Sequence, residues 1–235
     1  MTTLPISETF VSIQGEGKLT GTPSWFCRLS GCNLRCTWCD TPYASWNPEK
    51  ANRSIDELVT EALAHPARHA VLTGGEPMMF KGLIPLSQAL AHEGFHITIE
   101  TAGTLTLPGL VCHLMSISPK LANSTPVDDP RDPGGAWAKR HEARRLDYEA
   151  LNECIASAPD RQLKFVVSTP SDLDEIDGVL TNLRGYAPSD VMLMPEGVTL
   201  PEPSRVDWIV ETCMKRGWTY CPRLHIALFG DTRGT

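Results

Sequence analysis

The sequence has no run of 18 consecutive apolar residues, and its opening Met-Thr-Thr-Leu-Pro-Ile-Ser-Glu carries no basic stretch followed by an apolar one. These absences predict no membrane span and no secretion signal. An excess of positive charge is also lacking, because 21 Lys and Arg stand against 28 Asp and Glu and give a formal net charge of -7. Non-specific nucleic-acid binding needs a cationic surface, so we expect no direct nucleic-acid partner.

The length of 235 residues is enough to bury a full hydrophobic core, and 41% apolar with 21% charged residues is typical of a globular protein. We predict one domain over residues 1–235, with a short N-terminal lead-in and a C-terminal tail. Three of the eight cysteines are bunched at the spacing of metal ligands. This usage favours reduced thiols over a disulfide framework, and therefore a cytoplasmic location.

The sequence also lacks a fourth ligand to match these three cysteines. Cys32, Cys36 and Cys39 are spaced CxxxCxxC, and thiolates select zinc or iron-sulfur iron. A structural zinc site is normally closed by four protein ligands, yet no second cysteine pair follows and the nearest histidine, His65, stands alone. A 4Fe-4S cluster held by three cysteines leaves one iron open to a small molecule. We favour the open cluster, with a zinc site completed by a distant ligand as the alternative.

Helical and strand patterns alternate along the chain and predict an α/β fold with parallel strands. The link 101–110 is short for a crossover helix, so the third helix is expected to be missing or reduced. Six units fall short of a closed barrel, which predicts a partial (β/α)6 TIM-like barrel with its site at the C-terminal strand ends. After an extended segment at 5–13, the predicted strands are 24–29, 69–73, 96–100, 111–118, 162–168 and 191–194. The predicted helices are 54–65, 82–93, 147–157, 171–183 and 202–216, with 123–138 as a long loop and 221–225 as a candidate further strand.

Polar and glycine-rich segments follow three of these strands. Gly74-Gly75-Glu76-Pro77 follows the second, Glu100 to Thr104 the third, and Ser118-Pro119-Lys120 the fourth. Glycines leave the backbone open to a ligand, and barrel enzymes place binding groups at these ends. A simple turn remains the alternative for the Gly-Gly-Glu-Pro segment and for Ser118. Gln162 and Lys164 are weaker candidates.

The aromatic Trp38 precedes the third cysteine, and CxxxC followed by any residue, an aromatic and Cys resembles the motif of the radical S-adenosylmethionine (SAM) superfamily. The resemblance implies a 4Fe-4S cluster whose open iron binds the amino and carboxylate groups of SAM. Trp38 would then lie near the adenine. Gly74-Gly75-Glu76-Pro77 resembles the superfamily motif that hydrogen-bonds the methionine amino group.

A narrower resemblance covers essentially the whole chain. Its motifs are Phe10 to Gly17, Arg28 before Gly-Cys-Asn-Leu-Arg-Cys, Cys39-Asp40-Thr41, Glu100-Thr101, Ser118-Pro119-Lys120 and Pro222 to His225. Together they resemble the 7-carboxy-7-deazaguanine synthase family. This resemblance implies conversion of 6-carboxy-5,6,7,8-tetrahydropterin to 7-carboxy-7-deazaguanine with loss of ammonia. It also implies Mg2+ beside the cluster and SAM, and removal and later return of a hydrogen at substrate carbon 6.

The resemblance assigns roles to individual residues but names no catalytic acid or base. The implied cluster ligands are Cys32, Cys36 and Cys39, and the implied Mg2+ ligand is Thr41, which would otherwise be interpreted as a turn residue. The SAM site would comprise Trp38, Cys39, Asp40, Gly74, Gly75, Glu76, Gly103, Ser118, Pro119 and Lys120. The substrate site would comprise Ile13, Gln14, Gly15, Glu16, Arg28 and Thr101, with the planar fork of Arg28 on the substrate carboxylate. His225 fits substrate contact or simple packing of the tail equally well.

The resemblance also implies a homodimer and an electron donor such as flavodoxin. The basic segment from Lys139 to Arg145 is either a solvated loop and helix start or a docking patch for such an acidic donor. Two other functions stay open: an activase that makes a glycyl radical on a partner protein, and a non-catalytic zinc-stabilised binding module. The loop 123–139 and the residues after His225 match no motif of the family.

Overall fold

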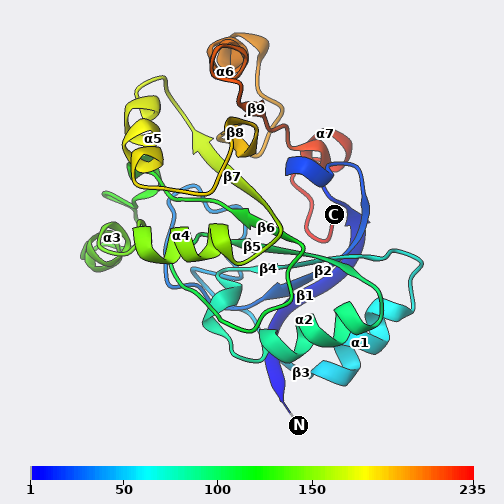
Figure 1. The fold of residues 1–235 in the computed structure, drawn as a ribbon. Helices are drawn as coiled ribbons and strands as arrows, with labels where there is room; N and C mark the ends of the chain where they lie inside the picture. Colours follow the sequence, from blue (N-terminus) through cyan, green and yellow to red (C-terminus); the bar gives the residue numbers. More distant parts are fainter. Residues whose placement is uncertain (1) are drawn as a thin grey trace.

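The computed structural model describes residues 2–235, in which strands and helices alternate around one curved sheet (Figure 1). The strands are β1 (Thr3–Ile13), β2 (Pro23–Leu29), β3 (Ala51–Ser54), β4 (His69–Gly74), β5 (His96–Thr101), β6 (Leu114–Ile117), β7 (Asp160–Val167), β8 (Val191–Pro195) and β9 (Thr219–Tyr220). The α-helices are α1 (Ile55–Leu63), α2 (Leu83–His92), α3 (Ala136–Glu142), α4 (Tyr148–Ala156), α5 (Asp172–Thr181), α6 (Pro203–Arg216) and α7 (Leu224–Phe229). Short 3-10 helices are η1 (Gly17–Leu19), η2 (Pro77–Met79), η3 (Ala122–Ser124) and η4 (Pro188–Asp190).

The nine strands form one sheet in the order β3-β1-β2-β4-β5-β6-β7-β8-β9. All neighbours from β2 to β9 are parallel, whereas β1 runs antiparallel to both β2 and β3. Because β3 and β9 end the sheet without pairing to each other, the barrel is open, as predicted. Within residues 2–235, no helix separates β5 from β6, which confirms the reduced third helix.

Local sequence signals explain most of the predicted elements. Ser54 caps α1 by accepting from the backbone N–H of Glu57 at 3.3 Å, while the Glu57 carboxylate accepts from the Ser54 N–H at 2.8 Å, so the capping box is confirmed. Gly217 ends α6 with φ 67°, a left-handed conformation that costs glycine little. Strand β4 is buried along nearly its whole length, as expected of a strand covered on both faces.

Two local expectations were wrong, and one strand was not predicted. Residues 221–225 form no strand; β9 lies just before them and α7 starts at Leu224. The loop predicted over 123–138 ends early, because helix α3 begins at Ala136, directly after Gly135 at φ 61°. Strand β3 was not predicted, because its four residues show no apolar alternation and it forms by pairing with the first residues of β1.

The parallel register brings the predicted site segments to one edge of the sheet. The cysteine loop follows β2, the Gly-Gly-Glu-Pro segment follows β4, and Thr101 ends β5 beside the start of the segment after β6. In Figure 1 the helices cover the outside of the curved sheet, and the segment after α7 turns back toward β1. Among the described residues, no helix is long and apolar enough to span a bilayer.

Candidate active site

A cavity of about 700 Å³ opens at the C-terminal edge of the strands. Open α/β sheets usually bind their ligands beyond the C-terminal ends of the parallel strands. The cavity brings together most of the residues that the sequence singled out: Ile13, Gln14, Gly15, Glu16, Arg28, Cys32, Cys36, Trp38, Cys39, Asp40, Thr41, Gly74, Gly75, Thr101, Ser118 and Lys120. Glu76, Gly103 and Pro119 lie outside its lining.

The three cysteines of the CxxxCxxC motif all face this cavity. Burial raises the pKa of Cys32 and of Cys36 to about 12, so metal binding must displace thiol protons at neutral pH. No group of three or more His, Cys, Asp or Glu side chains in residues 2–235 is arranged to hold a single metal ion. In an iron-sulfur cube each thiolate binds a different iron, so its ligands need not converge on one point. Three cysteine thiols on one loop match the donor set of a cluster that leaves one iron open.

The cysteine loop is held by hydrogen bonds from its main chain to residues 122–142, most of which belong to the loop 123–139 that matches no family motif. The N–H of Arg35 donates to His141 Nδ1 at 3.1 Å, and the N–H of Thr37 donates to the Ser124 carbonyl at 2.9 Å. The Arg35 guanidinium also lies 4.0 Å from the ring centre of Trp137. Residues 122–142 thus brace the cluster loop from outside the cavity.

Two glycines of the Gly-Gly-Glu-Pro segment face the cavity, and packing explains why one of them is glycine. A Cβ at Gly75 would lie 2.3 Å from the Gly31 carbonyl oxygen and 2.7 Å from that of Ala44. The end of β4 therefore approaches the cysteine loop more closely than a side chain permits.

Glu76 of the same segment is fully buried and bonds to protein groups. Its carboxylate accepts from the N–H of Met78 at 3.0 Å, the N–H of Ala102 at 2.9 Å and the hydroxyl of Thr101 at 2.9 Å. Burial raises the pKa of Glu76 above its ordinary value despite these donors. The side chain joins the ends of β4 and β5 beneath the cavity, and its contact with SAM stays a prediction, as do those of Gly103 and Pro119.

Trp38 and Lys120 lie close together in the lining of the cavity. The indole N–H donates to the Asn123 carbonyl at 3.1 Å, and Lys120 Nζ lies 5.5 Å from the ring centre. Lys120 also donates to the Ser118 hydroxyl at 2.7 Å. The arrangement presents an aromatic face, a hydroxyl and an ammonium to the cavity, as expected for recognition of a nucleoside bearing a carboxylate.

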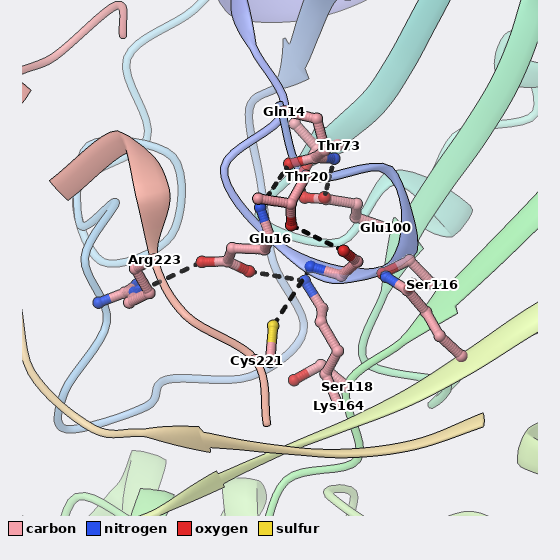
Figure 2. Close-up of polar contacts among 12 residues, drawn as sticks. Gln14, Glu16, Thr20, Thr73, Glu100, Ser116, Ser118, Lys164, Cys221 and Arg223 are labelled. Atoms are coloured by element: carbon pink, nitrogen blue, oxygen red, sulfur yellow. Dashed lines mark hydrogen bonds and ion pairs between the residues drawn. The ribbon is translucent and has the colours of Figure 1, made fainter. Parts of the chain in front are cut away.

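A buried ion network surrounds Glu16 in the turn after β1 (Figure 2). Lys164 Nζ donates to Glu16 at 2.6 Å, and Arg223 Nε donates to the other oxygen of the same carboxylate at 3.2 Å. Arg223 also pairs with Asp40 of the cysteine loop and donates to the Gly197 carbonyl. Burial opposes the negative charge of Glu16, but Lys164 and Arg223 together hold the pKa of Glu16 well below its usual value. In return, Glu16 raises the pKa of Lys164.

Next to this network, Gln14 and Glu100 form a second polar group (Figure 2). Gln14 Nε2 donates to Glu100 at 3.1 Å, Thr73 donates to the other Glu100 oxygen at 3.0 Å, and the Glu16 N–H donates to Gln14 Oε1 at 3.2 Å. Of the two weaker candidates from the sequence, Lys164 lines the cavity, whereas Gln162 lies outside its lining. The sequence analysis named Glu100 in a segment expected to bind ligands and Arg223 in a family motif, but it assigned a role to neither residue.

Thr41 and His225 complete the cavity wall. The Thr41 hydroxyl lies 3.8 Å from Cys39 Sγ, so an oxygen donor stands beside the cluster loop. A Cβ at Gly15 would fall 1.9 Å from Nδ1 of His225, so the turn after β1 and helix α7 pack without room for a side chain. Burial lowers the pKa of His225, which is therefore neutral at neutral pH.

An open parallel barrel whose strand ends gather a CxxxCxxC loop around one cavity defines the class of radical SAM enzymes, and the Radical SAM superfamily model matches residues 28–167. Over 235 residues the chain is 48% identical to the 7-carboxy-7-deazaguanine synthase of Rhodopirellula baltica, covering 99% of this chain and 89% of that protein. It is 46% identical over 240 residues to the enzyme of that name from Halobacterium salinarum, covering 99% and 93%. The crystal structure of QueE from Escherichia coli matches with a TM-score of 0.70 at 28% identity, covering 95% of both chains. The chain belongs to the 7-carboxy-7-deazaguanine synthase family of radical SAM enzymes.

Proposed function

We propose that this enzyme converts 6-carboxy-5,6,7,8-tetrahydropterin to 7-carboxy-7-deazaguanine with loss of ammonia, in queuosine and 7-deazapurine biosynthesis. The observation that carries the proposal is that the cysteine motif and the Gln14-Gly15-Glu16 turn, the two most specific parts of the family pattern, line one cavity, where Arg223 pairs with both Glu16 and Asp40. Family membership favours neither the glycyl-radical activase nor the zinc-stabilised binding module.

Membership of the family implies a 4Fe-4S cluster and SAM, which supply the radical chemistry when they are bound. In our proposal Cys32, Cys36 and Cys39 hold the cluster. Thr41 is proposed as a ligand of Mg2+, because a hard cation prefers oxygen donors and keeps positions for water or a substrate carboxylate. SAM is assigned to the aromatic and polar groups around the cluster: Trp38, Asp40, Gly74, Gly75, Glu76, Gly103, Ser118, Pro119 and Lys120.

The remaining wall of the cavity is assigned to the pterin. Gln14 and Glu16 are oriented by their own hydrogen bonds, so they meet the aminopyrimidinone edge with little loss of side-chain freedom. Lys164 remains protonated at neutral pH because its pKa is raised, so it acts as a fixed positive charge and accepts no proton. Thr101, Ile13 and Gly15 complete the contact surface, and Arg28 meets the substrate carboxylate.

The electron donor is proposed to dock on the outer face of α3, which contacts the cluster loop through Trp137 and His141. Two members of the expected basic patch serve other roles: His141 is buried, and Arg145 pairs with Glu142 and Glu175 at 2.7 and 2.6 Å. Lys139, Arg140 and Arg144 are exposed and suit an acidic partner such as flavodoxin. Reversing Lys139 and Arg144 to Glu should slow cluster reduction by flavodoxin at low salt but leave reduction by dithionite unchanged. Equal rates with flavodoxin would refute this docking face.

The chain is further proposed to act as a single-domain subunit of a homodimer in the cytoplasm. Leu228 and Phe229 of α7 are exposed apolar side chains that a partner subunit could cover, and all eight cysteines are free thiols, as suits a reducing compartment. Light scattering of Leu228→Glu against the unmodified protein tests the dimer. Monomers in both samples would refute it.

Anaerobic turnover with 6-carboxytetrahydropterin, SAM and MgCl2 tests the function. The protein should be brown, contain iron and labile sulfide, and form a product with the absorption of 7-carboxy-7-deazaguanine. Cys36→Ala should abolish turnover, whereas Cys213→Ala, which removes a cysteine outside the cavity, should retain it. SAM cleavage without the deazaguanine would refute the synthase assignment, and zinc without labile sulfide would refute the enzyme.

A further inference from the structure

Arg28 enters the cavity with only part of its guanidinium engaged. Its Nε donates to Glu8 at 2.7 Å, and the register of β1 and β2 sets Glu8 directly opposite Arg28. No residue in the described range 2–235 accepts a hydrogen bond from the two terminal nitrogens of Arg28, and neither nitrogen is a buried atom without a partner. The terminal fork is therefore open to the cavity and suits a carboxylate.

Glu8 presents an electrostatic problem for such a carboxylate. An anion arriving at the fork of Arg28 would meet the negative charge of Glu8, and one cation facing two anions is a weak recognition site. Glu8 is only 12% exposed in its side chain, so solvent screens this charge incompletely. A second donor to Glu8 would restore the attraction.

The second cation comes from the far end of the chain. Arg233 Nε donates to Glu8 at 3.0 Å, its Nη1 donates to Glu49 at 3.0 Å, and its guanidinium lies 4.0 Å from the ring centre of Tyr43. The Tyr43 hydroxyl also donates to Glu8, at 2.8 Å. Glu8 thus accepts from three side chains, which together outweigh the effect of burial and hold its pKa below the usual value.

Arg233 belongs to the segment 230–235, and every residue of that segment lines the cavity. The contacts of Arg233 with Glu8, Glu49 and Tyr43 therefore anchor the segment at the cavity. In the same cavity lining, the rings of Phe10 and Phe26 stack 4.8 Å apart, and the Arg28 guanidinium lies 5.8 Å from the centre of Phe10. The carboxylate subsite is thereby bounded by an aromatic pair, by the fork of Arg28 and by the segment that Arg233 anchors.

We propose that Arg233 is a positioning residue for carboxylate recognition: it neutralises Glu8, so that the terminal fork of Arg28 binds the substrate carboxylate, and it fastens segment 230–235 over that subsite. This inference rests on the proposed function. It deepens that function by adding Glu8, Tyr43 and Arg233, which the sequence motifs did not assign.

The test uses the cluster-loaded enzyme under argon. Arg233→Ala should raise KM for 6-carboxytetrahydropterin about threefold to tenfold, as expected for a partly exposed ion pair, with kcat changed less than about twofold. Arg233→Lys should recover most of the loss, because its ammonium can still pair with Glu8. Lys215→Ala, which removes an exposed cation of α6 paired only with Glu211, is the matched control and should leave KM unchanged.

Equilibrium dialysis then separates the carboxylate from the rest of the pterin. Arg233→Ala should weaken binding of 6-carboxypterin but leave binding of pterin, which lacks the carboxylate, unchanged; in an Arg28→Ala background it should have no further effect. Equal weakening of both probes, or a full effect without Arg28, would refute the positioning role. Failure of the unmodified enzyme to bind 6-carboxypterin would instead refute the substrate assignment.

Discussion

The buried pair of Lys164 and Glu16 should contribute strongly to stability, and Lys164→Met is the variant that measures it. Lys164 is 5% exposed and Glu16 is 15% exposed in their side chains, so truncating the lysine leaves a nearly buried carboxylate with Arg223 as its remaining cation. Removing one partner of a buried pair costs about 3 to 5 kcal/mol. Because Arg223 remains, we expect a loss of about 3 kcal/mol at pH 7.

The pH dependence of this loss follows from the pKa shifts. The folded-state pKa of Glu16 is depressed from 4.5, so its contribution is present above about pH 4.5 and declines as the pH falls. The folded-state pKa of Lys164 is raised from 10.5, so its contribution is present below about pH 10.5 and declines as the pH rises. The difference between the unmodified protein and Lys164→Met should therefore be constant between these limits and shrink in acid.

Urea unfolding under argon, with the slope compared between variants, measures this difference. The double variant Glu16→Gln with Lys164→Met should recover part of the stability, because no buried charge is left unpaired. Lys215→Ala, on an exposed pair, should cost less than about 0.5 kcal/mol. A loss below about 1 kcal/mol for Lys164→Met, or a difference that grows in acid, would refute the assignment of this pair.

Two further predictions concern the cavity wall. Gly15→Ala should lower kcat/KM at least about tenfold, because the new methyl group would overlap His225 and displace α7; Gly178→Ala in α5, where a Cβ meets nothing within 4 Å, should instead stabilise the protein by about 0.5 to 1 kcal/mol. A normal kcat/KM for Gly15→Ala would show that the turn and α7 can separate freely. Thr41→Val should abolish the stimulation of turnover by Mg2+, whereas Thr41→Ser, which keeps the hydroxyl, should retain it; stimulation of the valine variant would exclude Thr41 as a ligand.

The fold could be predicted wherever a local signal determined the element. The capping box at Ser54 and the glycine at 217 marked helix ends, and short buried apolar runs marked the parallel strands. Strand β3 and helix α3 carry no such signal. The first depends on pairing with β1, and the second is preceded by two glycines that favour a loop.

The residues of the site likewise separate into those that a local motif predicted and those that depend on contacts distant in the sequence. Most of the residues that the contiguous motifs predicted do line the cavity, because the chemistry of these motifs is concentrated in short segments. Arg223 and Arg233 escaped assignment because their contacts span most of the chain, from Arg223 to Glu16 and from Arg233 to Glu8. Glu76 shows the converse: a motif residue whose carboxylate is taken up by backbone and hydroxyl donors beneath the cavity.

The brace formed by residues 122–142 has a consequence for assembly of the cluster. Its contacts with the cysteine loop use the main chain of Arg35 and Thr37 and the indole of Trp38, so protein contacts restrain the shape of the loop. These restraints reduce the conformational entropy that the loop loses when iron binds. Iron loading of the apoprotein should resemble ligand docking more than coupled folding, with little change in amide exchange across the loop.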